Sequence, residues 1–216
     1  MSDRSGTDTK EQLLRAAERL FARDGIHGAR VREINELAQQ RNPSALHYHF
    51  GSRAGLLEAI LLHHQLEVDR VVRPRLDALE ADGGTASVRD IIETVVEPIV
   101  ARLDTESGRD WSRIIPQMLP ALSDNLRRGV VEPITPQMFR IMELLRNRID
   151  LPEAVQRERL VGYAVVFSGL LAERAHELES GRAPLLDREQ FTAHLVDVLT
   201  ALVTAPSSVP ERRRRR

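Results

Sequence analysis

Hydrophobic positions recur every three or four residues along most of this chain, which is the period of an α-helix, and no strand pattern stands out. Two such segments open the chain. The first follows Thr9 and Gln12, whose spacing resembles a capping box, and Gly25 closes it. The second spans 31–38, and Arg30 is a poor residue for the cap that precedes it. The pattern predicts two helices, after a disordered stretch at residues 1–8.

A third, short helix is predicted next. Asn42 is a good N-cap, and Pro43 suits the first helical position, where a missing N–H costs nothing. Leu46 and Phe50 are four residues apart and share one face, which leaves Tyr48 on another. A helix this short is not stable alone, so its neighbours must hold it and its exposed face must be what is used. With the helix before it, it predicts a helix-turn-helix arrangement.

The remainder of the chain also reads as helical. Pro74 is expected to end the helix that starts at Arg53, Pro98 to bend a later one, and Pro116 and Pro120 to interrupt another. Residues 160–172 are apolar almost all round, which predicts a helix buried on more than one side. The further helices are expected at 53–72, 88–103, 111–122, 133–149 or 136–149, 152–180 and 187–205.

Composition narrows the class of protein. The chain has 216 residues and no cysteine, which excludes a disulfide framework and a Cys-based metal site. It shows no secretory signal, and its uncharged stretch at 160–172 is shorter than the roughly 20 residues that span a bilayer. We therefore expect a soluble, cytoplasmic protein. Residues 1–53 carry 9 basic and 7 acidic residues, whereas residues 54–210 carry 17 and 24. A mildly basic N-terminal part followed by an acidic remainder is typical of a DNA-binding protein whose other domain has a different role.

The N-terminal motifs resemble a known family. LLRAAERLFARDGIHGARVREINELA, followed by SALHYHFGSRAGLL, is similar to the N-terminal domain of TetR-family transcriptional regulators over about residues 10–60. The chain departs from the usual family pattern at Arg30, at His47 and in the turn Gln39-Gln40-Arg41. These departures bear on the DNA sequence that is read and not on the fold.

The resemblance implies an all-α fold with a three-helix helix-turn-helix DNA-binding domain at 1–52. A helical ligand-binding and dimerisation domain would follow at 53–205, and 206–216 would form a disordered basic tail. It also implies a homodimeric repressor that binds a palindromic double-stranded DNA operator and is released by a small-molecule effector, without a cofactor. The residues expected to contact DNA include Arg32 and Arg41, which are further candidates for phosphate contacts. The others are Asn42, Pro43, Ser44, Ala45, His47, Tyr48, His49 and Arg53.

Two further sets of residues carry the C-terminal expectations. Large or adaptable side chains are candidates for a ligand cavity, although any one of them could simply fill core: Trp111, Met118, Phe139, Met142, Tyr163 and Phe167, with Met138 beside them. Apolar residues of the last helix repeat at bundle spacing. The resemblance implies that the last two helices pair across a two-fold axis, so these residues are expected at the dimer interface, with a core inside one subunit as the alternative: Phe191, Leu195, Val198, Leu199 and Leu202.

Other functions fit the sequence less well. His47 and His49 do not share a helix face, and His63 with Glu67 more often make a simple side-chain pair, so no metal site is expected. An enzyme using His63, His64, Glu67 or Glu97 lacks a nucleophile–base pairing or a phosphate-binding loop. A DNA-binding protein that ignores ligands stays open. The tail Arg212–Arg216 could add sequence-independent attraction to DNA.

Overall fold

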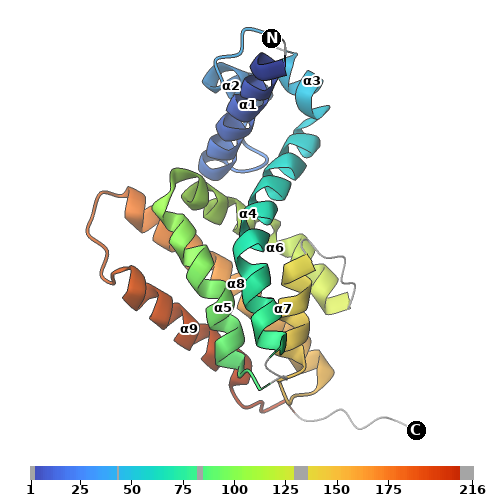
Figure 1. Cartoon of the computed structure of the whole chain (residues 1–216), viewed down its shortest axis with the longest axis vertical. Coiled ribbons are helices and arrows are strands. Elements are labelled where there is room, and N and C mark those ends of the chain that lie inside the picture. The colour runs from blue at the N-terminus through green and yellow to red at the C-terminus, as the bar shows by residue number, and fades with distance from the viewer. Residues whose placement is uncertain (1–2, 43, 82–84, 129–135, 210–216) are drawn as a thin grey trace.

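The structure is a computed structural model that describes residues 3–42, 44–81, 85–128 and 136–209. Within these ranges every regular element is helical. Figure 1 shows α1, α2 and α3 together at one end, with the long α4 running from that end into a bundle of the remaining helices. The helices are α1 (Asp3–Asp24), α2 (Val31–Leu37), α3 (Ala45–Phe50), α4 (Arg53–Ala81), α5 (Val88–Ala101), α6 (Glu106–Arg128), α7 (Pro136–Arg146), α8 (Glu153–Glu179) and α9 (Arg188–Thr204), with a 3₁₀ turn η1 (Arg102–Asp104).

The predicted helices are present, but several boundaries were wrong. α1 begins at Asp3, so Thr9 lies inside the helix and caps nothing, and residues 3–8 are helical. Pro74 lies inside α4, and Pro116 and Pro120 lie inside α6, where the sequence predicted breaks. Each proline removes one intrahelical hydrogen bond, and tertiary packing of the flanking apolar residues overrides that local cost.

The N-terminal helices enclose one hydrophobic core. It extends beyond residue 52, because Leu56 and Ile60 of α4 and Ile114 of α6 belong to it. Ile34 of α2 and Ala38 just after it contribute to this core, whereas Leu37 is exposed. The other buried members are Leu13, Ala16, Ala17, Leu20, Phe21, Ala29, Ala45 and Leu46.

A second core fills the bundle below. α8 and α9 bring the most buried aromatic residues to it, among them Tyr163 and Phe167. Asp187 caps α9 by accepting a hydrogen bond from the Gln190 backbone N–H at 2.8 Å. The α8 segment 160–172 is buried on several sides, also as predicted, although Val165 is exposed.

The last helix corrects a prediction. Leu195 is 0 % exposed within a single subunit, and Phe191 and Leu199 are buried beside it in the same core. Leu195 and Leu199 have no accessible surface and Phe191 is 8 % exposed, so all three pack inside their own subunit. The alternative, a core within one subunit, describes them better than a dimer interface. Val198 is only partly buried and Leu202 packs partly against the core. Periodicity identified the apolar stripe of α9 but not what covers it.

α6 joins the two cores. Ile114 lies within the N-terminal core, and Trp111 and Met118 pack against its edge. Gln117 binds the end of α1 in both directions: its amide oxygen accepts from the Ile26 N–H at 2.7 Å, and its nitrogen donates to the Phe21 carbonyl at 3.1 Å. The N-terminal unit therefore rests on α6 as well as on α4.

Candidate DNA-binding face and internal cavity

The short helix α3 presents one side chain outward more fully than its neighbours. Tyr48 is 84 % exposed, while Leu46, two residues earlier, is fully buried in the N-terminal core. The Asn42 side chain accepts a hydrogen bond from the Ser44 N–H at 2.9 Å, so it caps this turn even though the regular helix starts at Ala45. Gly51 ends the helix at φ +69°, and the Ser52 hydroxyl accepts from the Gly55 N–H at 3.0 Å.

The start of α3 corrects one predicted contact. Ala45 is only 6 % exposed and belongs to the core, so it was wrong as a DNA contact. The cause is rotational: Ala45 lies next to Leu46 on the inner side of a helix with a single exposed face. Pro43 lies outside the described residues. Phe50 is half-buried against the same core, with the Lys10 ammonium 5.9 Å from its ring centre.

The remaining predicted contacts are accessible to different degrees. Ser44, Arg41 and His47 are exposed, and the His47 Nδ1 lies 2.5 Å from the Gly51 carbonyl oxygen, to which it donates. His49 is half-buried. Arg32 is exposed and pairs with Glu36 at 2.7 Å. Arg53 is half-buried at the start of α4, with its guanidinium 5.5 Å from the centre of the Phe21 ring.

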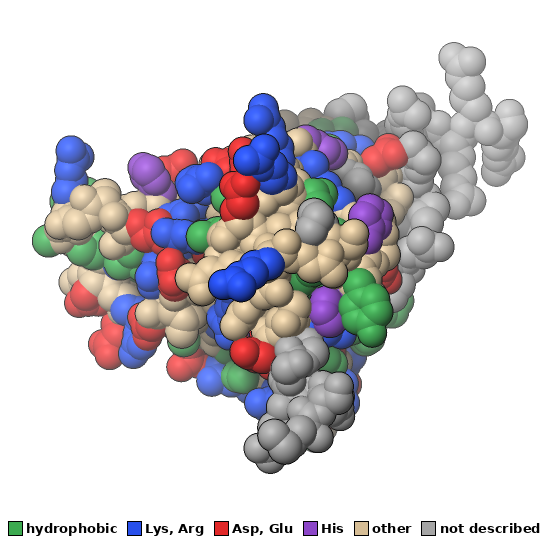
Figure 2. Space-filling model, turned by 90° about the horizontal axis from the view of Figure 1, so that it is seen from above, with side chains coloured by type: hydrophobic (Ala, Val, Ile, Leu, Met, Phe, Trp, Pro, Cys, Tyr) green, Lys and Arg blue, Asp and Glu red, His purple; other side chains and the backbone are tan. Residues whose placement is uncertain are grey.

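Figure 2 looks down on this end of the molecule. On the described part of this face, basic and acidic side chains are interspersed, and histidine side chains gather beside exposed hydrophobic surface. A phosphate backbone would therefore meet individual cations and not a continuous basic patch.

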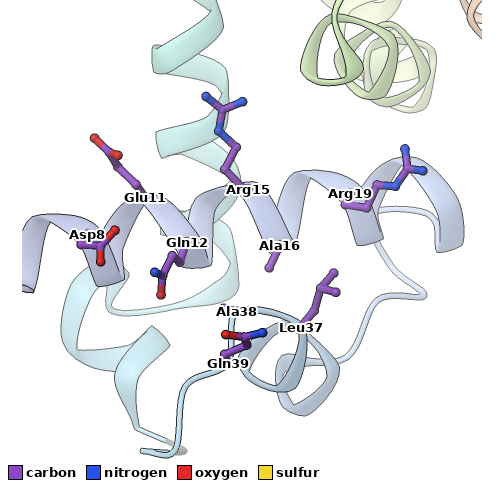
Figure 3. Close-up of a pocket in the computed structure, with 9 residues that line it drawn as sticks. All are labelled: Asp8, Glu11, Gln12, Arg15, Ala16, Arg19, Leu37, Ala38 and Gln39. Carbon is purple, nitrogen blue, oxygen red and sulfur yellow. The ribbon is translucent and has the colours of Figure 1, made fainter.

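The turn between α2 and α3 has a left-handed backbone. Gln39 has φ +55°, and the Gln40 side chain bridges to α1 by donating to the Gln12 amide oxygen at 2.9 Å. A shallow groove of about 450 Å³ follows α1 beside this turn. Figure 3 shows Gln12 and Ala16 pointing toward the end of α2, whereas the charged side chains of Glu11, Arg15 and Arg19 point to the other side of α1.

The second feature is a cavity of about 160 Å³ inside the C-terminal bundle. Five of the six predicted ligand-binding residues line it, and Met138 does too. Phe139 is not among the lining residues and is 38 % exposed, so its prediction was wrong; the next position along α7 from Met138 faces outward. The five are Trp111, Met118, Met142, Tyr163 and Phe167.

Polar groups in the wall of the cavity are few. The Ser112 hydroxyl donates to the Gly108 carbonyl at 2.8 Å and the Ser168 hydroxyl to the Ala164 carbonyl at 2.7 Å, so helix backbone already engages both. The Tyr163 side chain is 1 % exposed, and its hydroxyl has no hydrogen-bond partner among the described residues. Burial raises the pKa of this phenol well above its ordinary value, so it stays protonated and can donate.

A buried imidazole connects the cavity with the N-terminal unit. His64 of α4 lines the cavity and stacks on Trp111, with ring centres 4.4 Å apart and planes 9° from parallel. Its Nε2 lies 2.5 Å from a carboxyl oxygen of Glu18 in α1, and Arg102 of η1 contacts its Nδ1. The Ser107 hydroxyl also donates to Glu18, at 3.0 Å. The imidazole of His64, on α4, therefore contacts α1, η1 and α6.

The partners of His64 determine its protonation state. Arg102 can only donate, so Nδ1 must be the unprotonated acceptor and Nε2–H donates to Glu18. Burial lowers the pKa of His64 below its ordinary value and outweighs the nearby Glu18, which acts in the opposite direction. Geometry and burial both favour the neutral ring.

Sequence reasoning did not identify this contact, because it named His64 only among possible enzyme residues and did not name Glu18. One signal was present: Glu18 shares the helix face of Leu14 and Phe21, where a carboxyl group needs a buried partner. The partner itself is 46 residues away, beyond the reach of local pattern.

A second polar contact links α1 with the bundle at the surface. Arg19 pairs with Asp110 of α6 at 2.9 Å and with Glu179 of α8 at 3.4 Å. Asp110 is buried, and burial raises the pKa of its carboxyl although Arg19 acts against this. The N-terminal unit is therefore tied to the bundle by this cluster, by the Glu18–His64 hydrogen bond and by the Gln117 hydrogen bonds.

Other titratable groups on α4 form no site. His63 and Glu67 approach to 3.8 Å, and Glu67 also pairs with Arg102 at 2.8 Å. The described residues contain no group of three or more potential ligands placed to hold a metal ion. Within the described ranges, no helix combines the length and apolar composition that crossing a bilayer requires.

The N-terminal part of the chain is similar in sequence to known proteins. Residues 13–60 match the family model described as "Bacterial regulatory proteins, tetR family". The transcriptional repressor NicS of Pseudomonas putida is 34 % identical over 55 residues, a match that covers 26 % of this chain and 26 % of the relative. The shared segment therefore spans about a quarter of that protein's length.

Solved structures extend the likeness to the bundle. NalD, the secondary repressor of the MexAB-OprM multidrug efflux pump in Pseudomonas aeruginosa, has a TM-score of 0.54 and 19 % identity, with 91 % of this chain and 97 % of NalD covered. A tetR-family regulatory protein from Rhodococcus RHA1 has a TM-score of 0.54 and 16 % identity, with 92 % and 98 % covered. At this identity the likeness establishes the fold alone. The N-terminal segment 13–60 therefore matches the tetR family of bacterial regulatory proteins, and the whole chain shares the all-helical fold of these solved structures.

Proposed function

We propose that this protein is a homodimeric repressor that binds a palindromic DNA operator and is released from it by a small molecule. The observation that carries the proposal is the pairing of an exposed Tyr48 with a buried Leu46 on α3. The core fixes the helix through Leu46, so Tyr48 is held outward, where it can reach a base edge or a phosphate. The same operator would be met by Ser44, His47, His49, Arg41, Asn42, Arg32 and Arg53, and by Pro43 outside the described residues.

A second copy of the chain would bind the second half-site of the operator. One six-residue helix reads too little DNA for specificity, and a two-fold dimer presents two such helices to sites about one helical turn (~34–36 Å) or a multiple apart. An unpartnered face of α8 supports dimerisation. Val165 is exposed there, and nothing lies within 4 Å of a Cβ built on Gly169. Gly162 starts this face beside Leu202 of α9, so the partly buried Leu202 and Val198 would border the interface.

Release would follow from the contacts around the cavity. His64 and Trp111 line it and stack on each other, and His64 hydrogen-bonds Glu18 of α1. A ligand that favours another position of these two rings would favour another position of α1, and with it another separation of the two α3 helices. In energetic terms the ligand shifts the population toward a spacing that no longer fits the operator.

The proposal is tested by selecting bound DNA from a random pool with the full chain at fixed salt concentration. A palindromic site with two equal half-sites is the expected result. Failure to enrich any sequence would refute sequence-specific binding, and a single unpaired half-site would refute the dimer. A metabolite library scored for operator release in gel-shift titrations then separates a ligand-released repressor from a ligand-independent DNA-binding protein.

A further inference from the structure

The cavity in the C-terminal bundle has a definite chemistry, which restricts what can occupy it. Its volume of about 160 Å³ is close to that of an engineered apolar cavity of about 150 Å³ that binds benzene. A ligand with one six-membered ring and a short substituent fits this space, whereas a fused polycyclic molecule does not.

The wall of the cavity excludes a charge. Among its described lining residues there is no arginine, lysine, aspartate or glutamate. The only group among them that titrates near neutrality is His64, and both of its nitrogens are already engaged, by Glu18 and by Arg102. An ionised ligand would lose its hydration without gaining a counter-charge, which opposes binding strongly.

Among the described lining residues, one buried side-chain oxygen or nitrogen is without a hydrogen-bond partner. The Tyr163 hydroxyl is buried and makes no hydrogen bond with the described residues, whereas the hydroxyls of Ser112 and Ser168 are engaged by helix carbonyls. A buried polar group that lacks a partner is costly, and such groups are normally paired. As a neutral phenol it offers a donor to whatever enters the cavity.

We propose that the cavity binds a small uncharged ligand of about one ring, with a hydrogen-bond acceptor that takes the Tyr163 hydroxyl proton in a hydrogen bond. This inference rests on the proposed function only in calling the occupant an effector. Aromatic ketones, phenol ethers and lactones of this size belong to the class. Carboxylates, amines and phosphates do not.

Three probes with the same number of non-hydrogen atoms test the class: acetophenone, isopropylbenzene and benzoate. They share a phenyl ring and differ in a carbonyl acceptor, an apolar branch of the same shape, and a charge. Binding to the full chain is measured by ligand-observed NMR titration at neutral pH. We expect acetophenone to bind most tightly, isopropylbenzene about fivefold more weakly, and benzoate not measurably.

The Tyr163→Phe variant removes the donor and keeps the ring. It should weaken acetophenone binding about fivefold and leave isopropylbenzene unchanged, so the two probes serve as each other's control on one variant. Ala164→Leu fills the cavity from the same helix and should block both probes, which shows that they bind there. A thermal melt of each variant shows whether it is folded.

Several results would overturn the inference. Equal binding of acetophenone and isopropylbenzene to the unmodified chain would mean that the Tyr163 hydroxyl does not select an acceptor. Tight binding of benzoate, binding that survives Ala164→Leu, or no binding of any probe would each refute the assigned class, whatever happens to the Tyr163 variant. The operator is absent from these titrations. Tyr163-dependent binding of acetophenone without release of DNA in a separate gel shift would therefore contradict the proposed repressor mechanism and leave the ligand class intact.

Discussion

His64 and Glu18 form a buried hydrogen bond of 2.5 Å between the long helix α4 and α1, the first helix of the N-terminal unit. One face of the imidazole stacks on Trp111, which lines the cavity. One imidazole thus touches the cavity, through its own ring and through Trp111, and touches α1 through Glu18. A movement of Trp111 or His64 at the cavity wall can therefore displace α1 through the buried hydrogen bond to Glu18.

Removing the acceptor from this hydrogen bond should be costly. Glu18→Leu leaves the His64 Nε2–H buried without a partner, and the free energy of unfolding should fall by about 1–3 kcal/mol. Glu11→Leu is the matched control, because Glu11 is exposed on the same helix and its change should stay within about 0.5 kcal/mol. Urea unfolding of the two variants measures the difference, and equal effects would show that the buried hydrogen bond adds nothing.

The same imidazole predicts a pH dependence. The folded-state pKa of His64 is lowered, so below the unfolded pKa of about 6.5 the unfolded chain binds a proton that the folded chain resists. The contribution of His64 to stability is therefore complete above that pH and is lost as the pH falls through it toward the folded pKa. Protonation would also place an Nδ1–H against the Arg102 donor.

His64→Gln tests this dependence, because glutamine can donate and accept at the same site and does not titrate. The melting temperature of the unmodified chain should fall more steeply between pH values of about 7.5 and about 5.5, on either side of the ordinary histidine pKa, than that of the variant. Parallel slopes would mean that His64 is not the responsible group, since the other histidines are common to both proteins.

Association should depend on the open face of α8. Gly169→Glu adds a charged side chain where nothing in the subunit lies within 4 Å, so it should leave the folded subunit intact and prevent dimerisation. Sedimentation should report a monomer, and circular dichroism should show its helical content unchanged. Ala101→Glu, at an exposed position of α5, should remain dimeric. A dimeric Gly169→Glu protein would remove α8 from the interface.

The arginine run at the end of the basic tail lies outside the described residues, and its prediction rests on the sequence. Deleting Arg212–Arg216 should weaken non-specific DNA binding and make its salt dependence shallower, by about 0.9 in the logarithmic slope for each phosphate that the tail neutralises. The preferred DNA sequence should be unchanged. Selection from a random pool with the truncated chain checks this, and an altered consensus would show that the tail takes part in readout.

Sequence reasoning predicted the helical class, the helix-turn-helix unit and most of the cavity, because helical period and short-range capping are local properties. It was wrong where an apolar side chain could pack either in the core of its own subunit or against a partner outside it. Leu195 has the spacing of an interface residue, yet its own core covers it, and Ala45 lies one position from Leu46 on the inner side of α3. The prediction for Phe139 was wrong for the same reason on α7.

Other features depend on residues that are distant along the chain. Pro116 and Pro120 look like helix breakers, but α6 continues through them as one helix because it packs between the N-terminal unit and the bundle. The pairing of Glu18 with His64 crosses 46 residues, and no local pattern encodes it. The unpartnered Tyr163 hydroxyl is likewise visible only once the bundle closes around it.

The central claim is that α3 reads DNA with the face that carries Tyr48. Two substitutions on this helix should have opposite effects. Tyr48→Ala removes an exposed side chain, so stability should change by about 0.5 kcal/mol or less while operator binding weakens by about 1–3 kcal/mol. Leu46→Ala empties a fully buried site and should lower the free energy of unfolding by about 2–5 kcal/mol.

The most direct test of that claim is a gel-shift titration of the selected operator with the unmodified and Tyr48→Ala chains at one salt concentration, beside melts of both. The predicted result is a decrease of roughly 5- to 150-fold in affinity with the same melting temperature. Unchanged affinity, or an unfolded Tyr48→Ala protein, would contradict the assignment of α3 as the recognition helix.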